Sequence, residues 1–179
     1  MTIYNYGKIL NTYYLKEVMG VEDPRENILF HHQEFIRWAR SLESLPKEEW
    51  LRPVEEAKWS IAEIVGHLEP WDEFVVNKRL PFLGTGEPLP SAPDPQMLNE
   101  QSAAKARTSN QTAVIRQFIL TREKLIESLK EIPDESWEQT LKPSSKEITL
   151  IKYLEGLAEH DLHHKREVDR AIEKRNAGI

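Results

Sequence analysis

The sequence contains no cysteine among its 179 residues. This absence excludes disulfide bonds, a cysteine nucleophile, cysteine-based zinc sites and iron–sulfur clusters. A catalytic metal ion would therefore be held by histidine, aspartate or glutamate. Long apolar runs are missing as well, and residues 1–23 are rich in tyrosine and mixed charge, unlike a signal peptide. We therefore expect a cytoplasmic protein with no membrane partner.

Basic residues are in the minority, with 24 Lys and Arg against 30 Asp and Glu and a formal net charge of -6. One basic run near the C-terminus is interleaved with acidic residues and suits the negative end of a helix dipole. Nucleic-acid binding needs a more basic surface, so we expect a small-molecule substrate and no nucleic acid. The length and the 39% hydrophobic content predict one domain over residues 1–179, with residues 1–23 as an N-terminal extension.

The alternation of apolar and polar residues that is typical of β-strands is absent, whereas four stretches carry apolar residues at helical spacing. The first begins with Asp23 as a predicted N-cap, and the second opens with the capping-box pair Ser60 and Glu63. Pro70 removes one backbone donor from the second, so we expect a kink or local break there. The pattern predicts an all-α four-helix bundle. The helices are expected over residues 24–45, 60–80, 109–132 and 147–174.

Residues 81–107 contain five prolines and two glycines, which predicts a long crossover loop between the second and third helices. A loop of this length allows those two helices to run in the same direction. Long loops in compact domains serve as lids or as plain connections, and the sequence favours neither. We expect this loop to border the open side of any metal site.

Two of the six histidines share one face of the last predicted helix. His160 and His164 are four residues apart, so their imidazoles can converge on one point, as in the His-Glu-x-x-His zinc helices. His67 borders the apolar face of the second helix and can supply a third ligand. Three imidazoles would hold zinc, nickel or copper and leave a coordination position open. The competing interpretation is that each histidine is a separate core or surface residue.

Five further residues bear on this site: three are histidines outside the proposed ligand set, and two are candidates for other roles. His32 lies in the apolar stripe of the first helix and is predicted to face the interior without binding the metal, either in substrate binding or as a core histidine. His31 falls outside that stripe, and His163 is expected to be exposed. Glu63 is a candidate base or support for His67, although the capping box also explains it. Trp71 can line a cofactor pocket, although core packing explains it equally well.

Two segments resemble the signature segments of the DinB-like superfamily, and more narrowly of its YfiT-like branch. They are WSIAEIVGHL at residues 59–68 and EHDLHHKR at residues 159–166. The resemblance implies a four-helix bundle in up-down-down-up order and a homodimer formed through bundle faces. It also implies one divalent ion, nickel or zinc, bound by His67, His160 and His164. Many members continue with Gly-Gln where this sequence has Glu167 and Val168.

The resemblance implies either a metal-dependent hydrolase or a thiol-dependent transferase or isomerase that uses bacillithiol or mycothiol. In both forms the metal would act as a Lewis acid toward a water or an incoming thiol. Because the chain has no cysteine, a thiolate would come from a cofactor such as bacillithiol. The alternatives are a non-catalytic bundle that binds a metal or a small ligand, and an oligomeric structural protein. Turnover would distinguish the enzyme from both.

Overall fold

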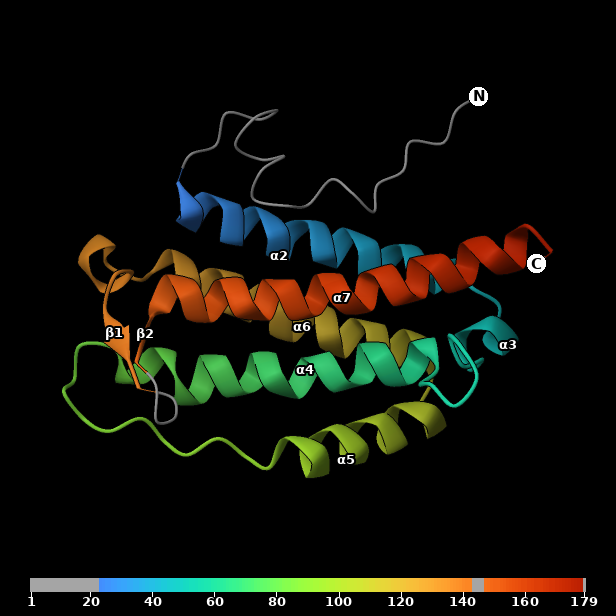
Figure 1. Ribbon diagram of the computed structural model, residues 1–179, viewed down its shortest axis with the longest axis horizontal. Helices are drawn as coiled ribbons and strands as arrows, with labels where there is room; N and C mark the ends of the chain where they lie inside the picture. Colours follow the sequence, from blue (N-terminus) through green and yellow to red (C-terminus); the bar gives the residue numbers. More distant parts are fainter. Residues whose placement is uncertain (1–22, 143–146, 179) are drawn as a thin grey trace.

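The computed structural model describes residues 23–142 and 147–178, so the predicted N-terminal extension lies outside the described residues except for Asp23. Four long helices form the bundle (Figure 1): α2 (Pro24–Ser41), α4 (Ile61–Lys78), α6 (Gln111–Lys130) and α7 (Leu150–Asn176). Helices α2 and α7 run in one direction, and α4 and α6 run in the other. The predicted four-helix bundle with up-down-down-up order is confirmed.

The beginnings of the helices follow from local side-chain chemistry. The Asp23 side chain accepts a hydrogen bond from the backbone N–H of Arg25, directly before Pro24 at the first helical position. Ser60 and Glu63 form both hydrogen bonds of the predicted capping box. Of the two outcomes predicted at Pro70, a kink or a local break, the break is wrong, because α4 continues through this residue. One lost backbone hydrogen bond is outweighed by the packing of α4 against α5 and α6.

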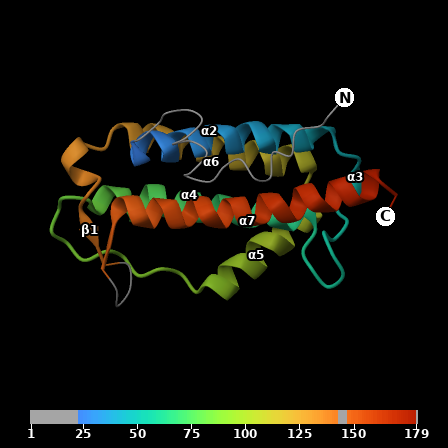
Figure 2. The same cartoon turned by 45° about the horizontal axis from the view of Figure 1, so that its top comes forward.

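The prediction of a loop over residues 81–107 is wrong in its second half, where α5 (Pro95–Thr108) forms and packs against α4. The prolines of residues 81–107 either precede this helix or occupy its first position, where a helix tolerates proline. Asp94 caps it by accepting a hydrogen bond of 2.8 Å from the N–H of Met97. In Figure 2, α5 lies on the side of the α4–α7 pair that faces away from α2 and α6.

The remaining elements are short. One pair of two-residue strands, which the sequence did not predict, joins antiparallel between α6 and α7. These short elements are η2 (Leu42–Ser44), α3 (Lys47–Trp50), η3 (Leu80–Phe82), η4 (Asp134–Ser136), β1 (Thr140–Leu141) and β2 (Ile148–Thr149).

The core fills the space between the four bundle helices. Phe35 of α2, Ile64 of α4 and Phe118 of α6 are fully buried in one cluster, and Leu125 and Leu154 belong to a second. Burial of such apolar side chains fixes the face that each helix turns inward. Within the described residues, no helix combines the length and the apolar character that crossing a membrane requires.

Candidate metal centre

The structure brings His67 of α4 together with His160 and His164 of α7. One nitrogen atom from each ring lies within 4.8 Å of the other two. The ring centroid of His164 is 4.6 Å from that of His67 and 4.6 Å from that of His160. The ring planes of these two pairs meet at 79° and 83°, respectively. His67 is buried, His164 is half-buried and His160 is exposed. The cluster therefore combines an anchored inner ligand with access from solvent.

Hydrogen bonds orient two of the three rings. The Nδ1 atom of His67 is 2.7 Å from the carbonyl oxygen of Ile64. A carbonyl oxygen can only accept, so Nδ1 carries the proton and Nε2 presents its lone pair. The Nδ1 atom of His164 is 2.9 Å from Oε2 of Glu167, which selects the same tautomer. Partners of this kind fix the orientation of metal-binding histidines in general.

The environment keeps these imidazoles neutral. Burial, together with the neighbouring His164 and His160, lowers the pKa of His67 to about 3. Burial also lowers the pKa of His160 and that of His164. Neutral imidazole is the form that binds a metal ion. Three neutral nitrogen donors with solvent access fit zinc or nickel and leave a coordination position for a further ligand.

Two tryptophans stand beside the cluster. The ring centroid of Trp59 lies 4.8 Å from that of His67. Trp71 is one helical turn beyond His67, and its Nε1 donates a hydrogen bond of 2.8 Å to Oδ1 of Asn99 in α5. Trp71 therefore ties α5 to α4 next to the site while remaining half-buried. Its part in binding a cofactor remains a prediction.

The carboxylate of Glu63 is bound by groups at the start of α4 and in α5. Its carboxylate accepts hydrogen bonds from the N–H and the Oγ of Ser60, at 2.9 and 2.6 Å, and pairs with Arg107 at 2.5 Å. Burial alone would raise the pKa of Glu63, but these partners outweigh it and lower the pKa. The capping-box interpretation therefore describes this residue better than a catalytic one.

A buried network behind the site joins all four bundle helices through Arg122 of α6. Its guanidinium donates to Oδ2 of Asp161 in α7 at 2.5 Å and to Oδ2 of Asp72 in α4 at 2.6 Å. It also lies 2.9 Å from Nδ1 of His32 in α2. Burial disfavours the charged carboxylate of Asp161, but Arg122 and His31 hold its pKa below the ordinary value.

Sequence reasoning missed most of this network. His31, which the sequence placed outside the apolar stripe, is nevertheless buried, and its Nε2 lies 3.0 Å from Oδ2 of Asp161. His32 is buried as predicted, and its Nε2 has no hydrogen-bond partner among residues 23–142 and 147–178. The sequence feature that indicates such a network is Arg122, a charged residue on the apolar face of its helix. His31, His32 and Asp161 are close enough to share a metal, but the charge of Arg122 between them opposes a cation.

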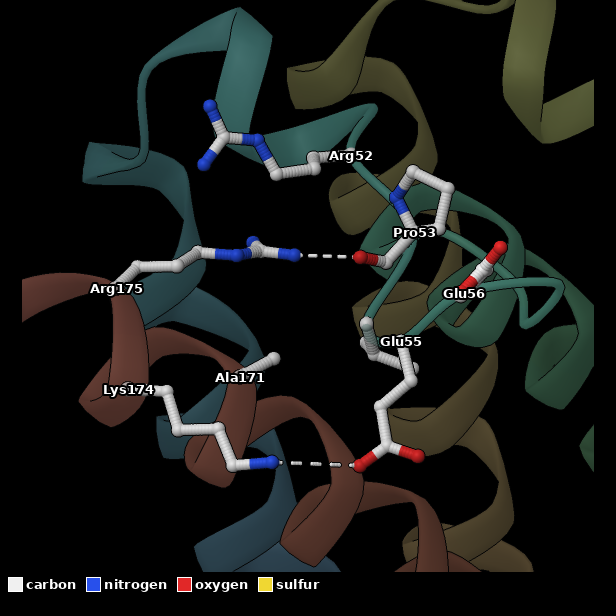
Figure 3. A pocket seen from close by; sticks show the side chains of 8 residues that line it. Arg52, Pro53, Glu55, Glu56, Ala171, Lys174 and Arg175 are labelled. Atoms are coloured by element: carbon white, nitrogen blue, oxygen red, sulfur yellow. Dashed lines mark hydrogen bonds and ion pairs between the residues drawn. The ribbon is translucent and has the colours of Figure 1, made fainter. Parts of the chain in front are cut away.

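A separate cavity of about 250 Å³ lies at the C-terminal end of α7 (Figure 3). Its cationic groups are already paired: Arg175 donates to the Pro53 carbonyl oxygen at 2.6 Å, and Lys174 lies 3.6 Å from Glu55. Ala171, in its lining, is seven residues beyond His164, which is about 10 Å along a helix. The cavity therefore supplies no group to the histidine cluster.

The family of the chain follows from a match over most of its length. A sequence model of the DinB superfamily matches residues 32–168, a span that includes all three clustered histidines. The chain belongs to the DinB superfamily. None of the curated proteins matches this DinB chain in sequence.

Solved structures show the same fold at low sequence identity. One is YfiT from Bacillus subtilis, described as a probable metal-dependent hydrolase with an unusual four-helix bundle topology. It has a TM-score of 0.70 and 15% identity, and the match covers 86% of this chain and 87% of YfiT. Another is the mycothiol-dependent maleylpyruvate isomerase, with a TM-score of 0.65 and 15% identity. That match covers 82% of this chain but 61% of the isomerase, so this DinB chain corresponds to only part of that enzyme.

Proposed function

We propose that this chain is a metal-dependent enzyme that acts on a small molecule at the site formed by His67, His160 and His164. The observation that carries the proposal is the convergence of three neutral imidazoles at a place that solvent can reach. A bound divalent ion, nickel or zinc, would supply Lewis acidity that lowers the pKa of a thiol or a water at its open position. The chain's own residues hold and orient that site: Ile64 and Glu167 fix the tautomers of two ligands.

The surroundings of the site favour a thiol over water as the nucleophile. Hydrolysis benefits from a carboxylate that can accept a proton from the attacking water. Glu63 is held by Ser60 and Arg107, and Glu167 is held by His164. No other carboxylate of the described residues joins the three imidazoles. Thiol-dependent transfer with a cofactor such as bacillithiol is therefore the first form of the proposal. It agrees with the mycothiol dependence of the similar isomerase.

Hydrolysis is the second form, and the description of YfiT supports it. We assign the protein to the cytoplasm, where low-molecular-weight thiols are kept reduced.

Association as a homodimer belongs to the same proposal and rests on the family resemblance. Light scattering of the purified chain would test it.

One assay separates the two forms. Monochlorobimane would be offered to the nickel-loaded and zinc-loaded protein with bacillithiol, with other thiols and with none, and a nitrophenyl ester would be offered without thiol. In transfer, the thiolate sulfur bonds to the chloromethyl carbon and chloride leaves with its electron pair. Metal-dependent and thiol-dependent conversion supports transfer, whereas metal-dependent ester cleavage without thiol supports hydrolysis. Equal rates for the metal-loaded protein, the metal-free protein and His67→Ala would contradict both forms. The alternative of a non-catalytic binding bundle would then be favoured.

A further inference from the structure

The side chains that α4 and α7 turn toward each other form a seam, and this seam extends beyond the three histidines. On α4, Trp71 and Phe74 follow His67 by four and seven residues, so they share its face. On α7, Tyr153 and Leu157 precede His160 by seven and three residues and share the face of that ligand. All four side chains are half-buried. Helices α4 and α7 run in opposite directions (Figure 1). Residues that follow His67 on α4 and residues that precede His160 on α7 therefore lie toward the same end of the bundle.

Arg79 places a guanidinium in this seam. The residue follows the last turn of α4 and is only 1% exposed. Its Cζ lies 4.2 Å from the ring centroid of Phe74. Burial raises the pKa of Tyr153 on α7, and the nearby positive charge of Arg79 acts against that rise. The guanidinium therefore packs on an aromatic ring of α4, on the face that carries His67, and its charge acts on Tyr153 of α7.

No carboxylate neutralises Arg79 within the described part of the chain. Its Nη1 donates to two carbonyl oxygens, those of Lys78 at 3.0 Å and Pro90 at 2.7 Å, and its Nε has no hydrogen-bond partner among the same described residues. The other fully buried arginine, Arg122, has two aspartates. The carbonyl end of α4 offsets part of the charge of Arg79. A buried cation without a counter-charge is costly, and a ligand anion would remove that cost.

We propose that Arg79 binds the carboxylate of the substrate, while the substrate's apolar body lies along Trp71, Phe74 and Leu157 and its reactive carbon faces the histidines. This inference rests on the proposed function and narrows its substrate class to small organic acids. The seven residues from Tyr153 to His160 advance about 10 Å along α7. That spacing fits an acid with an aromatic or short aliphatic body.

Calorimetric titration of the full chain with 4-phenylbutyrate and with its uncharged amide would test the subsite. The titrations use both the zinc-loaded and the metal-free protein. The carboxylate should bind at least ~10-fold more tightly than the amide in both states, as expected for a charged hydrogen-bonding pair. Arg79→Met should abolish this preference and Arg79→Lys should keep part of it. Arg116→Met removes an exposed arginine of α6 and should change nothing.

The Nε–H resonance of Arg79 in the wild-type NMR spectrum gives a second readout that does not depend on folding of a variant. It should shift on titration with the carboxylate and stay in place with the amide. Equal affinity for the two compounds in the wild type would overturn the inference. So would a preference that persists in Arg79→Met and needs zinc, because the carboxylate would then be binding the metal. These readouts measure binding without turnover, so their failure leaves the proposed thiol chemistry standing, and a failed thiol assay leaves them unaffected.

Discussion

Gly66 of α4 lies so close to Ala106 of α5 that a Cβ atom added at position 66 would fall 2.3 Å from the Cβ atom of Ala106. No pair of real Cβ atoms approaches this distance, so only glycine permits the observed contact. Gly66 directly precedes His67, and the contact therefore sets how closely α5 packs beside the histidine cluster. The position of α5 is fixed by backbone approach as well as by apolar burial.

Replacing Gly66 with alanine should destabilise the protein by about 1–3 kcal/mol, because the two helices must separate. Urea denaturation would measure the change. The double variant with Ala106→Gly should recover most of the loss. Gly156→Ala is the matched control, since its added Cβ would meet no described atom within 4 Å outside its own stretch of helix, and alanine favours helix. A Gly66→Ala protein as stable as Gly156→Ala would show that the close contact is not present in solution.

Glu167→Gln should weaken metal binding by about 10–100-fold, because the carboxylate that orients and polarises His164 is lost. Competition with a chromophoric zinc chelator would give the affinity. The control is Glu173→Gln, which removes an exposed carboxylate six residues further along α7. Unchanged affinity in Glu167→Gln would mean that the ring of His164 is held by other contacts.

Arg122→Met should lower the free energy of unfolding by about 3–5 kcal/mol, since Asp161 and Asp72 are left buried without their cation. The exposed Arg116→Met is again the comparison, and it should lie within about 0.5 kcal/mol of the wild type. A similar small loss in both variants would show that the two aspartates are reached by water.

The stability of the metal-free protein should fall as the pH drops below 6.5. Burial lowers the pKa of His32 well below 6.5, and the charge of Arg122 adds to this effect. In that range the unfolded chain binds a proton that the folded protein does not, so stability decreases toward acid pH. Urea denaturation between pH 7.5 and 5 would measure the slope, which His32→Gln should reduce and the exposed His163→Gln should not. Parallel curves for wild type and His32→Gln would contradict the burial of a neutral imidazole at position 32.

The features that sequence predicted are those encoded over a few residues. Apolar spacing located the four bundle helices, the Ser60–Glu63 spacing predicted a capping box that both hydrogen bonds confirm, and the four-residue step from His160 to His164 suggested converging rings. Helix α5 was not predicted, because the dense prolines of residues 81–95 are typical of a loop, although Asp94 and Pro95 are good helix start signals. The partners of His31 and Arg122 come from other helices, more than 35 residues away, and only the fold brings them together.

The metal content of the purified protein tests the central claim most directly. Elemental analysis after loading and gel filtration should find one divalent ion per chain in the wild type and in His163→Ala, and almost none in His67→Ala, His160→Ala or His164→Ala. The reason is that only these three rings bring a nitrogen within 4.8 Å of one another between α4 and α7. A wild-type chain that retains no metal, or a site emptied by His163→Ala and still filled in His164→Ala, would contradict the account.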